Sequence, residues 1–378
     1  MNFRQVSGTD SKENTILSGI LKIEYNIDLE GKCIKINSEG KIIIDFVFDD
    51  EQGILLNDDI DLYAFKPLTD IVVKGHLYNY KLQSIFQASI NVEGRKEFSI
   101  LGLGKRNAFI TNTGVCKFSE PTIESKIELN YKNAYGGQDD YTLSVKKSKD
   151  ELDDYQLMAI ADGDFNPFNY PRNPVGKGWV INEESLKNSE LELPQLEYPN
   201  QLLSPNNLFV NHQDNWINKV LPRSTGWFNL TWFPRVAYIG FPPEFWKSNL
   251  RGGLPELQDG LVESDILQEK GIENQQNIRA ANGASLGLQF PYLKGNEKIK
   301  LTNIHPTKQD FVLQLPGDRP KIWVDGRNGT LKPTTPVIHT IVIEPDEGRL
   351  SIVWRGSAPA LRPYMDEELK TMPFKVEW

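Results

Sequence analysis

Apolar and polar residues alternate with a period of two through the first hundred residues of the chain. Between Leu21 and Leu29 every second residue is apolar, and charged or amide side chains stand between them. This alternation is typical of a strand with one buried face and one wet face. Ile34 and Ile36 resume the pattern after a Glu-Gly-Lys turn, and residues 42–48 repeat it after a second turn. Because these connections are short, we expect the three strands to be antiparallel neighbours.

The carboxy-terminal end has the same character. Strand-like runs are separated there by turns rich in Gly, Asp and Pro, at residues 311–315, 321–324, 337–343 and 350–354. Helix is expected around residues 261–281, where the apolar rhythm is closer to 3.6, and at residues 366–371.

The middle of the chain differs from both ends. Residues 170–255 hold ten of the 23 prolines, and residues 179–246 hold five of the eight tryptophans. Proline disfavours long regular elements, whereas tryptophan is costly to leave in water, so we expect ordered loops packed on the sheets.

These patterns predict a mainly β fold, with antiparallel β-sandwich or meander regions at both ends and few short helices. The expected domains are an amino-terminal β domain (1–150), a loop-rich segment (151–290) and a carboxy-terminal β region (291–378). One continuous β fold with a large insertion is the alternative.

Net charge, apolar runs and cysteine content narrow the possible partners, the location and the kinds of site expected for this chain. The net charge is −9, which makes a nucleic-acid partner improbable on electrostatic grounds. No apolar run approaches the roughly 20 residues of a membrane helix, and the first residues lack an apolar signal region, so we expect no membrane partner and a cytoplasmic location. Cys33 and Cys116 lie too far apart to indicate a disulfide framework or a metal motif.

Motifs of catalysis and metal binding are weak. No nucleophile-elbow motif is present. The four histidines have no ligand-pair spacing and are interpreted as structural: His76, His212, His305 and His339. Residues 162–166 resemble the opening of a calcium loop, but Pro167 stands where the turn glycine belongs. We expect no cofactor, no metal and no enzymatic activity.

Paired carboxylates leave one enzymatic alternative open. Asp139-Asp140 and Asp153-Asp154 are adjacent pairs, and neighbours on a strand point to opposite faces. A carbohydrate-binding protein or glycosidase that uses surface Trp with Asp or Glu remains the competing hypothesis, since glycosidase carboxylates are often distant in sequence.

Seven short motifs follow one another along residues 60–356. They are Phe65–His76, Tyr131–Gly137, Asn173–Trp179, Leu193–Glu197, Lys300–Pro306, Leu315–Gly317 and Ile343–Arg349. In this order they resemble the bacterial domain-of-unknown-function family number twenty-one sixty-nine, which accompanies type VI secretion clusters. Ala280–Gly283 departs from the family's usual Asn-Ala-Ala-Pro run.

The resemblance implies a type VI secretion adaptor. Such a protein binds a toxic effector, often through a spike-tip (PAAR-like) domain, and hands it to the secretion spike. It is a cytoplasmic, chaperone-like binder that performs no bond chemistry. The implied partners are therefore a secreted effector and spike-tip proteins.

The motif residues are interpreted as structural, with the glycines supplying turns or close backbone approach. They are Lys66, Pro67, Asp70, Gly75, His76, Tyr135, Gly136, Gly137, Asn173, Pro174, Gly176, Gly178, His305 and Pro306. Lys66 and Asp70 are expected to form an ion pair at a strand entry. Interfaces are enriched in Trp and Arg, so we predict the partner-binding surface at Trp216, Trp227, Trp232, Arg235 and Trp246.

Overall fold

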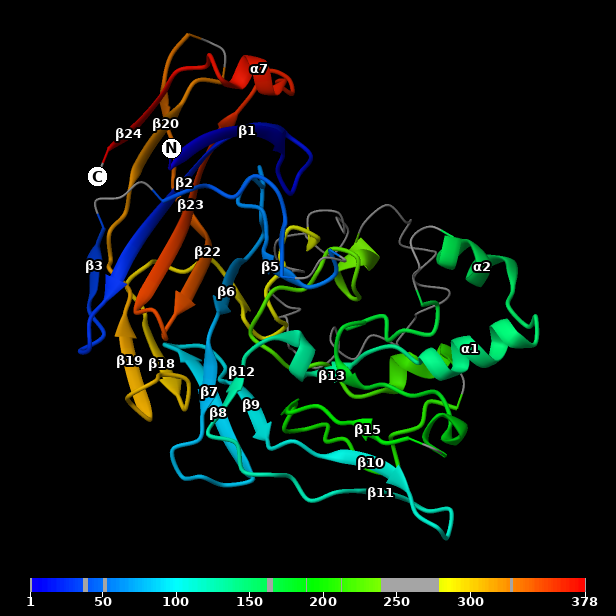
Figure 1. The fold of residues 1–378 in the computed structure, drawn as a ribbon. Coiled ribbons are helices and arrows are strands. Elements are labelled where there is room, and N and C mark those ends of the chain that lie inside the picture. Colours follow the sequence, from blue (N-terminus) through cyan, green and yellow to red (C-terminus); the bar gives the residue numbers. More distant parts are fainter. Residues whose placement is uncertain are drawn as a thin grey trace. The chain divides into compact units, whose positions relative to one another are not determined.

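The computed structural model shows a chain built mainly of strands, which confirms the predicted mainly β class (Figure 1). It describes residues 2–377 except 37–39, 50–52, 162–165, 188, 212, 239–278 and 327–328. The chain divides into two compact units. Unit 1 comprises residues 1–75, 89–98 and 225–378, and unit 2 comprises residues 76–88 and 99–224.

Unit 1 is built on a sheet with the strand order β1-β2-β23-β22-β6-β17. Its strands are β1 (Phe3–Thr9), β2 (Thr15–Ile27), β6 (Thr69–Val73), β17 (Gln289–Phe290), β22 (Val337–Glu344) and β23 (Arg349–Pro359), and β3 (Cys33–Lys35) pairs with β2. All pairs are antiparallel except β22 with β6. Figure 1 shows β2, β23 and β22 side by side, so the two ends of the chain share one sheet.

Smaller sheets complete unit 1. They are the pair β4 (Val47–Phe48) and β5 (Leu56–Asp58), the group β20 (Lys321–Val324), β21 (Lys332–Pro333) and β24 (Phe374–Glu377), and the pair β18 (Lys298–Thr302) and β19 (Asp310–Gln314). The end of β8 (Ile85–Val92) pairs with β18. Among the described residues of this unit, helical turns are η4 (Arg235–Tyr238) and α7 (Asp366–Leu369), and α7 confirms the helix expected at 366–371.

Strand β2 is more deeply buried than its sequence pattern predicts. Residues 16–23 are buried on both faces. Lys22 lies among them because its ammonium forms an ion pair with Asp61, 3.1 Å away. The alternation therefore predicted the strand correctly, but it did not predict that the polar face of the strand is buried as well. Burial of this face is possible because the Asp61 carboxylate neutralises the Lys22 charge.

The prediction of a third meander strand at residues 42–48 is wrong. Residues 41–46 have no strand structure, and β4 pairs with β5 rather than with β3. Ile43 instead exchanges hydrogen bonds with Asp61, its N–H donating to the carboxylate at 2.8 Å and its carbonyl accepting from the Asp61 N–H at 2.8 Å. These two hydrogen bonds pair the backbone N–H and carbonyl of Ile43 without a neighbouring strand.

Unit 2 contains short strands and the two longer helices of the described chain. The strands are β7 (His76–Tyr78), β9 (Phe98–Leu103, from Ser99 onward), β10 (Asn107–Ile110), β11 (Cys116–Phe118), β12 (Lys126–Glu128), β13 (Tyr135–Gly136), β14 (Lys177–Gly178), β15 (Leu191–Glu192) and β16 (Leu196–Glu197). The helices are η1 (Tyr131–Asn133), α1 (Asp140–Ser148), α2 (Asp154–Ala161), η2 (Glu183–Leu186) and η3 (Gln213–Asn218). Its core gathers aromatic and aliphatic side chains around Tyr135, Tyr170 and Trp179.

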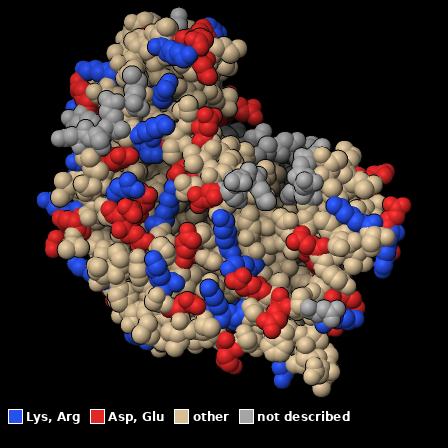
Figure 2. Space-filling view, viewed as in Figure 1, with Lys and Arg blue, Asp and Glu red and all other residues tan. Residues whose placement is uncertain are grey.

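The division into units differs from the three consecutive segments expected from the sequence, because β2 pairs with β23 across most of the chain length. The helices α1 and α2 were not predicted. The helix predicted at 261–281 lies almost wholly outside the described residues. No helix in the described part of the chain has the length and apolar character needed to span a bilayer. Figure 2 shows basic and acidic side chains interspersed over the visible face.

Candidate functional site

Lys66 and Asp70 form a buried ion pair in unit 1. The Lys66 ammonium lies 2.7 Å from the Asp70 carboxylate, and the two side chains are 1% and 0% exposed. Lys66 also donates to the Thr340 hydroxyl at 3.0 Å. Asp70 lies in β6 directly opposite Thr340 of β22, so the parallel register of these two strands brings the three side chains together. The expectation of an ion pair at this strand entry is confirmed.

A second buried pair joins Arg235 to Asp59. The guanidinium lies 2.6 Å from the carboxylate and also donates to the Tyr63 hydroxyl at 2.8 Å. Two more of its N–H groups donate to the carbonyls of Ala280 and Phe228, at 2.6 and 2.8 Å. Burial raises the pKa of the Asp59 carboxyl, and the adjacent Arg235 and Lys66 charges oppose that shift.

The loop at residues 280–283 connects the two pairs. The Asn282 amide and the Gly283 N–H both donate to the Asp70 carboxylate at 2.9 Å. A Cβ on Gly283 would lie 2.4 Å from the Asp59 carboxylate, so only glycine fits between the pairs. We call Asp59, Lys66, Asp70 and Arg235 the buried ion-pair cluster.

The predicted partner-binding residues of unit 1 are interior rather than on a surface. Trp227, Trp232 and Arg235 are only 3%, 2% and 2% exposed. The Trp227 ring lies 5.4 Å from the Lys66 ammonium, as a cation-π partner of the buried ion-pair cluster. The predicted surface location of these three side chains is therefore wrong, because the charges they accompany are matched inside the fold.

The remaining predicted partner-binding residues lie elsewhere. Trp216 belongs to unit 2, where it is half-buried at the edge of the core and the Arg172 guanidinium lies 4.8 Å from its ring. Arg172 also donates to the Trp216 carbonyl at 3.1 Å. Trp227 belongs to unit 1, so Trp216 and Trp227 do not share a unit. Trp246 lies outside the described residues.

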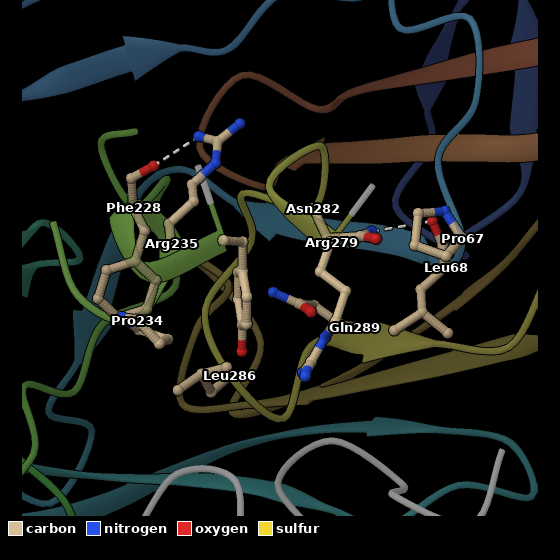
Figure 3. A pocket seen from close by; sticks show the side chains of 10 residues that line it. Pro67, Leu68, Phe228, Pro234, Arg235, Arg279, Asn282, Leu286 and Gln289 are labelled. Atoms are coloured by element: carbon tan, nitrogen blue, oxygen red, sulfur yellow. Dashed lines mark hydrogen bonds between the residues drawn. The ribbon is translucent and has the colours of Figure 1, made fainter. Parts of the chain in front are cut away.

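A small pocket borders the buried ion-pair cluster (Figure 3). It is lined by Pro67, Leu68, Phe228, Pro234, Arg235, Tyr238, Arg279, Asn282, Leu286 and Gln289. Figure 3 shows the Arg235 guanidinium turned toward the Phe228 carbonyl. The pocket has a volume of about 10 Å³, which is enough for one water molecule. This is far below the roughly 300 Å³ of a small-molecule site. Asn282 Oδ1 is buried and has no hydrogen-bond donor within the described chain.

The glycine motifs meet in unit 2. The side-chain amide of Asn173 donates to the carbonyls of Tyr131 and Tyr135 at 2.9 and 3.0 Å, and the main-chain carbonyl of Asn173 accepts from the Gly137 N–H at 2.8 Å. Gly136 has a φ of 151°, and a Cβ there would lie 2.0 Å from the Asn173 carbonyl oxygen. Strands β13 and β14 pair beside this contact, where Tyr135 lies opposite Lys177.

Other motif residues also lie in well-packed surroundings. Pro67 and Pro174 are buried, while Pro306 is half-buried. Gly178 and Gly75 have positive φ, and a Cβ on Gly176 would lie 2.5 Å from the Ala134 carbonyl oxygen. These positions agree with a structural interpretation of the motifs.

The two histidines of the motifs make ring contacts. His305 stacks on Phe311 with ring centroids 4.1 Å apart, and its Nδ1 accepts from the Thr307 N–H at 3.2 Å. Burial and the nearby Lys308 lower the pKa of His305. The half-buried His76 ring lies 6.1 Å from that of Tyr78.

The paired carboxylates act at helix ends. Asp139 caps α1 by accepting from the Thr142 N–H at 2.9 Å, and its other oxygen accepts from the Ile181 N–H at 2.8 Å. Asp153 accepts from the Gln156 N–H at 2.8 Å, at the start of α2. Residues 162–165 of the calcium-like run lie outside the described residues. Within the described ranges, no three metal-ligating side chains come together.

Sequence reasoning missed one of the four members of the buried ion-pair cluster. Asp59 was not among the predicted site residues, and the loop 280–283 stood out only by its departure from the family pattern. Asp59 lies beside Asp58 and two positions before Asp61, so its local sequence resembles that of an exposed acidic stretch and gives no signal of a buried partner.

Comparison with known proteins gives one match. The model of a family described as "Uncharacterized protein conserved in bacteria (DUF2169)" matches residues 13–355. Neither the curated proteins nor the solved structures yield a match.

Proposed function

The chain belongs to this family of bacterial proteins, DUF2169, and from that premise we propose that it is a type VI secretion adaptor. In this role it binds a toxic effector in the cytoplasm, by way of a PAAR-like domain, and presents the effector to the secretion spike. The adaptor role comes from the family resemblance of the motifs.

One observation favours a binding protein over an enzyme. Lys66 and Asp70 of the first motif are bound to each other inside the fold, and Lys66 also donates to the Thr340 hydroxyl. Arg235 is likewise bound to Asp59. Side chains held in this way stabilise the molecule and leave recognition of a partner to its outer surface.

Co-expression with the effector gene that neighbours this gene tests the proposal. We expect the effector to co-purify with the tagged protein, and secretion to fall when the gene is deleted and to return on complementation. An effector that lacks its spike-tip domain is the matched control and should not co-purify. An effector that is equally soluble and equally secreted without this protein would contradict the adaptor role.

The carbohydrate alternative is a separate outcome of the same study. Binding to an immobilised glycan panel, or release of reducing sugar from it, would favour that alternative. Under the adaptor proposal neither signal rises above that of an unrelated control protein.

A further inference from the structure

An exposed apolar segment lies in unit 1, where it includes the strand β4 that pairs with β5. Ile44, Val47 and Phe48 are 51%, 42% and 38% exposed. Exposed apolar side chains scattered singly need no explanation, but here three occur within five positions. We call residues 44–49 the acidic-apolar segment.

The chain on either side fixes this segment in place. Ile42, two residues earlier, is 4% exposed and packs with Ile20 and Val353. At the other end the Asp49 N–H donates to the Leu55 carbonyl at 2.9 Å, next to the pairing of β4 with β5. The exposure is therefore built into the fold at both ends.

Charge defines the character of the segment. Asp45 and Asp49 are exposed on either side of Val47 and Phe48, and within the described chain neither carboxylate has an ion-pair partner. Asp58 of β5, the register partner of Val47, is by contrast matched by Lys74 at 2.5 Å. The segment thus offers apolar side chains flanked by two unmatched negative charges.

From this arrangement we propose that the acidic-apolar segment is a docking surface for a polypeptide segment that carries apolar side chains flanked by Lys or Arg. Anionic lipid and nucleic acid would be repelled by the two carboxylates. A second copy of this chain, placed symmetrically, would bring the same charges together. The inference rests on the proposed function, in that the effector is taken as the partner.

Effector binding by surface variants tests the docking surface. Val47→Ser/Phe48→Ser removes apolar contacts, and Asp45→Lys/Asp49→Lys reverses the charges. We expect each to weaken binding at least about tenfold, and the charge variant to abolish the salt dependence of association. The matched controls in unit 2, Val115→Ser and Glu120→Lys, change equally exposed side chains and should bind like the wild type.

A synthetic probe separates this inference from the adaptor role. The probe is a twelve-residue peptide of alternating Leu and Lys, compared by fluorescence anisotropy with one of alternating Leu and Glu. We expect the Lys peptide alone to bind, and Asp45→Lys/Asp49→Lys to lose that binding even if the serine variant fails to fold.

The outcomes are distinct. If the effector binds wild type and both surface variants equally, the proposal of a docking surface is contradicted, while the proposed adaptor role is still supported. If the effector does not bind at all but the Lys peptide binds in the expected way, the adaptor role fails and the surface stands. Equal binding of the Lys peptide to wild type and charge variant overturns the surface.

Discussion

Four charges lie in the interior of unit 1, within the buried ion-pair cluster. Removing an ion from water costs several kcal/mol, so each charge needs both a counter-ion and hydrogen bonds. Asp70 has the Lys66 ammonium and two N–H donors, and Arg235 uses four contacts. Loss of any one member would leave an uncompensated charge in the interior of the unit.

Removal of one partner should therefore be severe. We expect Lys66→Met to lower the free energy of unfolding by about 3–5 kcal/mol, since Asp70 is left as a buried charge. Lys66→Met/Asp70→Asn should cost less than the sum of the single changes, which a double-mutant cycle in urea measures. The exposed pair Glu184 and Lys187 is the control and should show no measurable coupling. Additive single changes at Lys66 and Asp70 would contradict the paired role.

The second residue-scale prediction concerns His339, which lies at a bulge in β22 and is 1% exposed. Burial, with the charges of Arg355 and Lys66, lowers its pKa well below the usual value. As pH falls through about 6.5 the unfolded chain takes up a proton that the folded chain does not, so stability falls.

Between pH 7 and pH 5 this single histidine should cost at most about 2 kcal/mol of the free energy of unfolding. His339→Leu should remove that loss, so the difference between variant and wild type should grow in favour of the variant on acidification. Urea unfolding at several pH values measures it. Parallel pH profiles for the two proteins would show that His339 does not titrate in this way.

At the scale of elements, the alternation of apolar and polar residues predicted long strands but could not predict two-residue strands. Strand β8 (Ile85–Val92) lies within the first hundred residues, where apolar and polar residues alternate. Strands β13 and β14 are held instead by the Asn173 side chain and by close backbone approach at Gly136. Such pairs depend on contacts between motifs nearly 40 residues apart.

Gly136→Ala tests this dependence. The added Cβ would meet the Asn173 carbonyl oxygen, which rigid backbone holds, so we expect a loss of more than about 3 kcal/mol or failure to fold. Gly114→Ala in the same unit is the matched control, because its φ is also positive, at 78°, but nothing lies within 4 Å. It should cost only about 1–2 kcal/mol, measured by chemical denaturation. Equal losses would mean that conformation rather than the Asn173 contact sets the requirement.

At the scale of the whole molecule, each unit has its own buried tryptophan. Trp232 is 2% exposed in unit 1, and Trp179 is 2% exposed in unit 2, where its indole N–H donates to the Phe168 carbonyl at 2.8 Å. Truncation of a buried tryptophan to alanine costs about 3–5 kcal/mol.

We expect Trp232→Ala to speed hydrogen exchange first in unit 1, for example in β22 and β23, and Trp179→Ala to do so first in unit 2, for example in β10 and β11. Mass spectrometry of exchanged peptides reads both units in one sample. Uniform acceleration throughout the chain by either change would show that the units open together.

Local regularities of the chain were enough to predict the mainly β class, most of the long strands and the helix at 366–371. They suffice because the alternation of side chains along a strand reports directly which face meets water. The Lys66–Asp70 pair also followed from the chain, since the two residues are only four positions apart. Family membership followed from motifs in order, since a linear order can be compared without any knowledge of contacts.

Burial of Trp227, Trp232 and Arg235 could not be read in this way. It depends on Asp59 and on the loop 280–283, which reach Arg235 from distant parts of the chain. The register of β6 with β22 likewise places Thr340 beside Lys66. Whether a tryptophan or a charge faces water is set by what packs over it, and spacing along the chain carries no record of contacts made across hundreds of residues.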